Sequence, residues 1–363
     1  MKVKDLIKAI ETLAPSSYQE KYDNSGLQCG DYLADAKGAL ITLDCTEEIV
    51  EEAIKKSCNV IIAHHPIIFG GINNISHENH IGRTLIKAIK NDINIYAAHT
   101  NLDNVSEGVN AKIAEKLELF DTNMLSKKKN ILTKLHVFCP LEHSEKVRNA
   151  MFQAGAGNIG DYSECSFNYK GEGSFKAGSQ SNPFVGNIGK RHIEEEIKVE
   201  VVFEKHKTHN IINAMLKAHP YEEAAYDLYD LSNAHPNIGS GMIGKIKKTK
   251  TKDFILMLKS KFEAEGLRCT KLINDTIETV AFCGGAGSFL LNQAIRQNAD
   301  IFITADFKYH QFFDANDKII IADIGHYESE QFTKELIISH LSEKFPNFAL
   351  HLSEINTNPI KYY

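Results

Sequence analysis

Short apolar runs alternate with helical stretches in both the first and the last third of this 363-residue chain. In the first third, runs at residues 37–43, 59–63 and 93–98 are separated by helical patterns at 47–56 and 81–90. The runs are apolar throughout, which is typical of strands buried on both faces of a sheet. This β-α-β-α-β order predicts an α/β domain.

The last third of the chain returns to the same style. Strands are predicted at 279–283, 301–304 and 318–321, and helices at 253–263, 289–297 and 329–340. In both thirds, a strand that runs into a metal-type side chain is followed by a second such strand. We therefore expect two similar α/β halves that form one metal-binding core.

The middle of the chain has a different pattern, which predicts an inserted domain. A polar segment at 123–130 marks its start, and a segment at 233–242 looks like a return linker. Between them we expect strands and helices in the order β-α-β-β-α-β of a ferredoxin-like unit, with a Gly/Ser/Asn-rich hairpin at 171–190. The predicted limits are 1–127 for the first core half, 128–233 for the insert and 234–363 for the second core half.

Composition excludes several classes of protein. The net charge of −6 argues against a general nucleic-acid or anionic-membrane binder. No apolar run approaches the roughly 18 residues that span a bilayer, and residues 1–13 read as an amphipathic helix, not a signal peptide. Seven scattered cysteines without a Cys-x-x-Cys pair suit a reducing compartment, so we expect a cytoplasmic protein.

Six predicted core strands end in residues capable of chemistry. In open α/β sheets, ligands bind outside the carboxyl ends of the strands, so parallel strands would gather these groups along one edge. The groups are Asp44, the pair His64 and His65, His99 with Asp103, the glycine-rich loop 284–288, Asp306, and His326 with Glu330.

Imidazoles and carboxylates in this set indicate a metal site. The tandem pair His64-His65 alone could be one core and one surface histidine. His326 and Glu330 strengthen the metal interpretation, because residues four apart at a helix start can direct their side chains to the same side. With Asp103, three imidazoles and two carboxylates suffice for two ions if a carboxylate and a hydroxide bridge them. Mixed nitrogen and oxygen ligands favour two zinc, manganese, iron or similar ions over calcium.

Two further groups are weaker candidates. Amides of Gly285 and Gly287, with Ser288 at a helix N-terminus, could hold a phosphate, or the loop is a tight turn. Asp306 and His310 could carry protons or contact substrate, or they belong to a solvated loop.

Two segments outside these groups also allow more than one interpretation. Residues 22–27 are a structural turn or a wall of the site. The motif that begins at His219 ends a helix of the insert, where a second metal site is an alternative.

The motifs at 22–27, 63–66, 99–103, 284–288, 304–306 and 325–330 together resemble the Nif-three-like family, also named type 2 GTP cyclohydrolase I homologs. The resemblance spans nearly the whole chain, and the segment at 219–228 is similar to the PII/CutA-like insert of longer bacterial members. Tyr22 stands where Trp is common in the family, and Ala305 where Gly is usual. The resemblance implies a toroidal homohexamer and a dinuclear site, with Glu330 as the bridge. The ligands it implies are His64, His65, Asp103, His326 and Glu330.

The expected function is a metal-dependent hydrolase acting on a nucleotide or a related phosphorylated small molecule. The family name implies opening of the GTP imidazole ring with release of formate. Two alternatives remain: phosphoester hydrolysis at the same two-metal site, and a metal-binding regulatory or scaffold protein without turnover.

Overall fold

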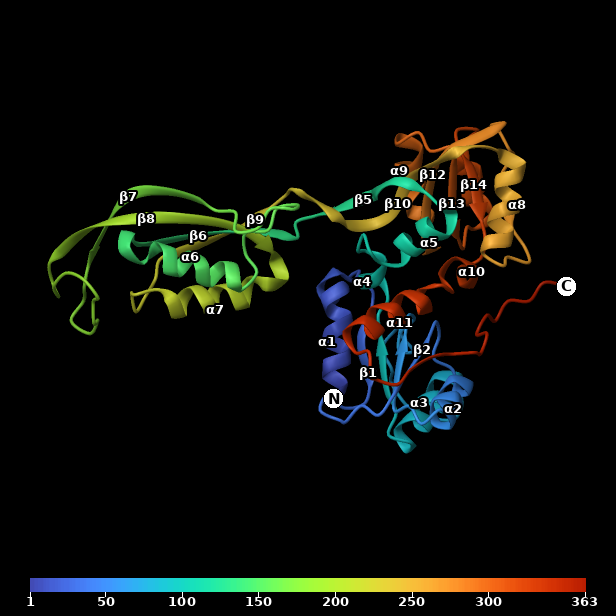
Figure 1. The fold of residues 1–363 in the computed structure, drawn as a ribbon, viewed down its shortest axis with the longest axis horizontal. Coiled ribbons are helices and arrows are strands. Elements are labelled where there is room, and N and C mark those ends of the chain that lie inside the picture. Colours follow the sequence, from blue (N-terminus) through green and yellow to red (C-terminus); the bar gives the residue numbers. More distant parts are fainter. The chain divides into compact units, whose positions relative to one another are not determined.

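The structure is a computed structural model that describes residues 1–363 and divides into two compact units (Figure 1). Met1–Lys127 and Pro236–Tyr363 form the first unit, and Lys128–His235 form the second. The protein has a mixed α/β fold with several sheets. None of its helices combines the length and apolar character needed to cross a membrane.

A five-stranded sheet occupies one part of the first unit, in the order β1-β4-β3-β2-β15. Its central strands β2, β3 and β4 are parallel and buried along their whole length, as expected for apolar runs covered on both faces. β1 pairs antiparallel with β4. The strands are β1 (Gly26–Cys29), β2 (Ala39–Thr42), β3 (Val60–Ala63), β4 (Asn94–Ala97) and β15 (Leu350–Leu352).

Helices cover this sheet. α2 (Glu47–Lys55) and α3 (His80–Lys90) bury Ile49 and Leu85 against sheet residues such as Ile61. α1 (Val3–Leu13) contacts α11 (Thr333–Lys344), and α11 also contacts β2 and β15. The short helices α4 (Thr100–Asp103) and α5 (Val109–Leu117) follow β4.

A six-stranded sheet, in the order β11-β14-β13-β12-β10-β5, occupies the rest of the first unit. Its strands β12, β13 and β14 are again parallel. Short helical segments, including α9 (Leu291–Arg296), pack over Phe302 and Ile321. The strands are β5 (Phe120–Lys129), β10 (Ala234–Lys250), β11 (Arg268–Cys269), β12 (Thr276–Ala286), β13 (Ile301–Ala305) and β14 (Ile320–Asp323).

Both segments predicted as polar connections are strands. β5 includes most of the 123–130 segment, and β10 includes 234–250; the two are neighbours in the six-stranded sheet. The polar residues of β5 are typical of a connection, so the sequence does not predict a strand here. Because β5 lies at a sheet edge, only Met124 and Leu125 are buried. The helix predicted at 329–340 is also two helices, α10 (His326–Glu330) and α11. Helix α8 (Thr251–Lys261) contacts β12.

The second unit contains an antiparallel sheet in the order β7-β8-β6-β9. Much of the segment predicted as a hairpin belongs to long strands, because β7 runs to Lys176 and β8 starts at Arg191. Helices α6 and α7 pack on Val137 and Val199. The elements are β6 (Leu132–Pro140), α6 (Ser144–Gln153), β7 (Phe167–Lys176), β8 (Arg191–Glu204), α7 (Thr208–Ala218) and β9 (Tyr226–Leu231).

Candidate metal centre

The site lies where the carboxyl ends of parallel strands from the two sheets of the first unit meet. His64 and His65 follow β3 of the five-stranded sheet, and Asp103 ends α4, just after β4. His326 begins α10, directly after β14 of the six-stranded sheet, and Glu330 ends that helix. Parallel strands within each sheet align these positions, so ligands distant in sequence come together.

One group of acceptor atoms is buried without hydrogen-bond partners. His64 Nε2 lies 3.5 Å from Asp103 Oδ1 and 3.8 Å from Glu330 Oε1. His64 Nδ1 lies 2.7 Å from the carbonyl oxygen of Ala98, so Nδ1 donates and Nε2 presents its lone pair to the carboxylates. Neither His64 Nε2 nor Asp103 Oδ1 has a hydrogen-bond partner. Acceptors that face one another in a buried place could hold a cation, which would compensate for their lost solvation.

The protonation states of His64 and Asp103 also suit a cation at this position. Burial lowers the pKa of His64, which keeps its imidazole neutral. Burial and the charge of Glu330 raise the pKa of Asp103 well above its usual range. Two carboxylates this close and this buried are costly unless positive charge lies between them.

A second group contains His65, His326 and the other oxygen of Glu330. Glu330 Oε2 lies 2.9 Å from His65 Nε2 and 3.0 Å from His326 Nε2. Glu330 therefore offers one oxygen to each group of potential ligands, as a bridging carboxylate would. Each of the two groups therefore contains residues that could hold a metal ion.

In the metal-free protein, protons on His65 and His326 balance the negative charge of the second group. Burial lowers the pKa of His65, but hydrogen bonds to Asp44 and Glu330 outweigh burial and raise this pKa to about 9. The charge of Glu330 raises the pKa of His326 to about 11. Although burial raises it, the charge of His326 holds the pKa of Glu330 well below its usual range.

Each imidazole of the second group is oriented by a carboxylate behind it. Asp44 Oδ1 accepts a hydrogen bond of 2.7 Å from His65 Nδ1, and Asp306 Oδ2 accepts one of 2.6 Å from His326 Nδ1. This arrangement leaves both Nε2 atoms free to face a metal, as in carboxylate–histidine–metal triads. Asp306, predicted as a proton carrier or substrate contact, accepts a hydrogen bond from His326 in the structure.

His99 and Asp23 belong to the same site, although no sequence pattern pairs these two residues. The ring of His99 lies 5.4 Å from that of His64 and 5.5 Å from that of His65. His99 Nδ1 and Asp23 Oδ1 are 2.7 Å apart, and Asp23 also accepts from the backbone N–H of Thr100. The segment 22–27 therefore contributes to the wall of the site.

Comparison with known proteins places this chain in a family. A family model described as Duf34/NIF3 (NGG1p interacting factor 3) matches residues 1–359. The chain belongs to the Duf34/NIF3 family. A Bacillus subtilis protein named GTP cyclohydrolase 1 type 2 homolog is 38% identical over 98% of this chain and 97% of its own length.

Solved structures of related proteins share the whole fold. The crystal structure of a Bacillus cereus protein related to NIF3 has 35% identity and a TM-score of 0.86, and the match covers 100% of this chain and 99% of that one. A Staphylococcus aureus protein of known structure has 29% identity and a TM-score of 0.79 over the same shares of the two chains.

The glycine-rich loop of this Duf34/NIF3 chain, predicted as a phosphate cradle or a tight turn, directs two of its amides to side chains of the protein itself. The amide of Gly285 donates to Ser329 Oγ and that of Gly287 donates to Thr304 Oγ1, both at 2.9 Å. Gly285 has φ +59°, and a Cβ atom there would lie 2.4 Å from Glu330 Oε1. The loop therefore makes room for the central carboxylate, because only glycine permits this close approach.

Two other predicted site residues lie apart from the cluster or are already used. Ser288 Oγ accepts a hydrogen bond from Gln311 Nε2 at 3.2 Å. His310 is exposed and packs against Tyr309 and Phe313, with ring centroids 5.2 and 6.5 Å away.

A cavity of about 350 Å³ lies beside the two ligand groups. Its lining includes His99 and three exposed aromatic side chains, Tyr22, Phe69 and Phe289. The rings of Tyr22 and Phe69 lie 6.3 Å apart. No lysine or arginine lines the cavity.

Proposed function

We propose that this protein is a hydrolase that holds two divalent metal ions, one in each ligand group, with Glu330 bridging them. His64, Asp103 and Glu330 Oε1 would hold one ion, and His65, His326 and Glu330 Oε2 the other. The observation that carries the proposal is the pair of buried, unpartnered atoms His64 Nε2 and Asp103 Oδ1, 3.5 Å apart. Zinc, manganese and iron suit such mixed nitrogen and oxygen ligands.

The chain's own residues prepare the site for hydrolysis. When bound, two such ions lower the pKa of a bridging water and stabilise the attacking and leaving oxygens. Asp44 and Asp306 fix the orientation of His65 and His326. Asp23 engages Nδ1 of His99, which lines the cavity, so its Nε2 is the nitrogen available to exchange a proton with a substrate.

The cavity favours a planar, uncharged reacting group. Tyr22, Phe69 and Phe289 offer aromatic surface on which a heterocyclic base can stack. Since no lysine or arginine lines the cavity, this chain offers no basic side chain to a phosphate there. Ring opening of a nucleotide base, the chemistry that the name of the relatives suggests, fits these features better than phosphoester hydrolysis.

Incubation of the metal-loaded protein with GTP tests this function. Formate release, with a fluorescent pterin after oxidation, supports ring opening. Orthophosphate alone supports phosphoester hydrolysis instead, and consumption of no compound in a nucleotide panel supports a non-catalytic metal protein.

Variants show whether any turnover belongs to the proposed site. Glu330→Gln should abolish both metal binding and turnover. Glu335→Gln, which alters a more exposed carboxylate five positions later, is the matched control and should keep both.

We also propose the finer organisation that the resemblance implies. The two core halves would be a structural repeat, and 128–233 would be a ferredoxin-like, PII/CutA-like insert. The chain would assemble as a homohexamer in the cytoplasm. Light scattering of the purified protein tests the assembly, since a stable monomer or dimer would contradict it.

A further inference from the structure

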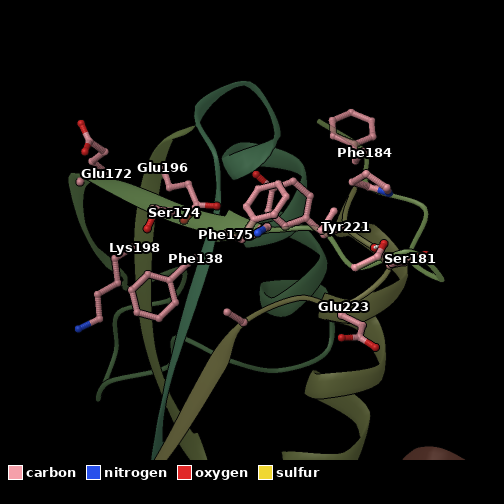
Figure 2. Close-up of a pocket in the computed structure, with 18 of the residues that line it drawn as sticks. Phe138, Glu172, Ser174, Phe175, Ser181, Phe184, Glu196, Lys198, Tyr221 and Glu223 are labelled. Atoms are coloured by element: carbon pink, nitrogen blue, oxygen red, sulfur yellow. Dashed lines mark hydrogen bonds between the residues drawn. The ribbon is translucent and has the colours of Figure 1, made fainter. Parts of the chain in front are cut away.

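A second cavity, of about 650 Å³, lies in the second unit and has no part in the metal centre (Figure 2). Its floor is formed by β7 and β8, on the face opposite the core that α6 and α7 cover. Glu196 and Lys198 line the cavity, whereas Val199 and Val201, whose side chains point to the other face, are buried against the helices.

Gly171 opens the floor of this cavity, whereas the carboxylate of Glu196 occupies the space beside Gly173. Gly171 pairs with Glu196, and Gly173 pairs with Glu194, so positions 171 and 173 share the face that carries Glu196. A Cβ atom added at Gly171 would meet nothing within 4 Å. The strand therefore leaves open space where most residues would place a side chain.

Aromatic rings form a corner of the cavity. The ring of Tyr221 lies 6.2 Å from those of Phe175 and Phe184, at interplanar angles of 59° and 48°. His219 fixes this arrangement, because its Nδ1 accepts from the backbone N–H of Tyr221 and its Nε2 donates to the carbonyl of Phe138. Rings arranged in this way present aromatic faces and edges to a group held between them.

A carboxyl without a cationic partner lies beside these rings. Glu196 lines the cavity next to Tyr221, and no lysine, arginine or histidine pairs with it. Burial raises the pKa of Glu196, although a hydrogen bond with the Tyr221 side chain opposes that rise, so a bound cation would stabilise the charged carboxylate. Lys198 does not fill this role, because its Nζ donates to Tyr169 Oη at 2.7 Å and pairs with Glu200 at 3.2 Å.

We propose that this cavity binds a compact alkylammonium group, with Glu196 as its counter-ion and Phe175, Phe184 and Tyr221 as its aromatic walls. Aromatic faces attract ammonium groups, and a partly desolvated carboxylate strengthens that attraction. The motif that begins at His219 thus positions an aromatic wall, and both ring nitrogens of His219 are used for this purpose.

Choline and its neutral isostere, the alcohol in which carbon replaces the ammonium nitrogen, form a matched pair of probes. Their binding to the full-length protein can be followed by ligand-observed NMR. Choline should bind saturably, and about tenfold more tightly than the isostere, because only the charge differs. Equal binding of the two probes, or no saturable choline binding, would overturn the proposal.

Variants locate the binding. Glu196→Gln should weaken choline binding about tenfold, whereas Glu195→Gln should leave it unchanged, because Glu195 points to the other face of β8. Gly171→Leu should fill the cavity and abolish binding while the circular dichroism spectrum stays that of the parent protein. Unchanged choline affinity in both Glu196→Gln and folded Gly171→Leu would contradict the site.

Discussion

The Nε2 atom of His65 lies 3.2 Å from the Nε2 atom of His326, although 261 positions separate the two residues. Glu330 Oε2 completes a triangle with them, at 2.9 and 3.0 Å. Ligands around a tetrahedral ion with bonds of about 2 Å lie about 3.3 Å apart. The triangle is therefore close to the size that a bound ion requires, and only small outward shifts would admit one.

Removing a ligand that belongs to one group should remove one ion. Asp103→Asn and His326→Ala each alter a single group, so metal content per chain should fall from two ions to one. Asp314→Asn, at an exposed position, should keep both. Elemental analysis measures the content, and electron paramagnetic resonance of the manganese form should change from a coupled pair to a single ion. Loss of both ions in both variants would show that the groups do not act separately.

The carboxylates behind the imidazoles should tune metal affinity. Asp44→Asn and Asp306→Asn keep a side chain that accepts a hydrogen bond but remove its charge. Metal affinity should fall by about 10- to 100-fold, the usual effect of such outer partners. Competition with a chelator measures the change. Affinities equal to that of the parent protein would mean that neither residue orients a ligand.

Metal binding should release protons near neutral pH. His65 has a pKa of about 9 and His326 one of about 11 without metal, so both are protonated at pH 7. A ligand imidazole must be neutral, so apparent affinity should rise as the pH increases from about 6 to about 9. Calorimetry in buffers with different ionisation enthalpies counts the protons released. An affinity independent of pH across this range would contradict this charge state.

Asp23 should stabilise the fold mainly above acidic pH. Hydrogen bonds from His99 and Thr100 outweigh burial and hold its pKa below the ordinary value. This stabilisation is therefore present above the unfolded-state pKa of about 3.9 and is lost as the pH falls. Asp23→Asn should lower the free energy of unfolding by about 2 kcal/mol at neutral pH.

Urea denaturation of metal-free protein measures this difference. The exposed Asp35→Asn is the control and should leave the free energy of unfolding nearly unchanged. The difference between Asp23→Asn and the parent protein should shrink at acidic pH. A difference that stays constant down to low pH would indicate that the charge of Asp23 is not its source.

Much of the site could be predicted because its residues occupy positions that the sequence makes visible. His64 and His65 follow an apolar run, and His326 and Glu330 are spaced by one helical turn. Parallel pairing then brings such positions together. That these residues bind metal stays a prediction, because the structure establishes only that their ligand atoms lie close together.

Other parts of the site could not be predicted, because they depend on pairing between distant segments. Asp23 reaches His99 only because β1, which follows it, pairs antiparallel with β4. Gly285 appeared to be part of a phosphate loop, yet its positive φ and its closeness to Glu330 are properties of the folded backbone. The strand character of β5 was hidden for a related reason, since an edge strand needs few apolar residues.

Anomalous diffraction from crystals grown with manganese tests the proposed dinuclear site most directly. Two peaks are expected about 3.5–4 Å apart, with Glu330 bound to both ions. His64 and Asp103 should hold one ion, and His65 and His326 the other, at about 2 Å. A single peak, or no ion in contact with Glu330, would show that this protein has no carboxylate-bridged pair of ions.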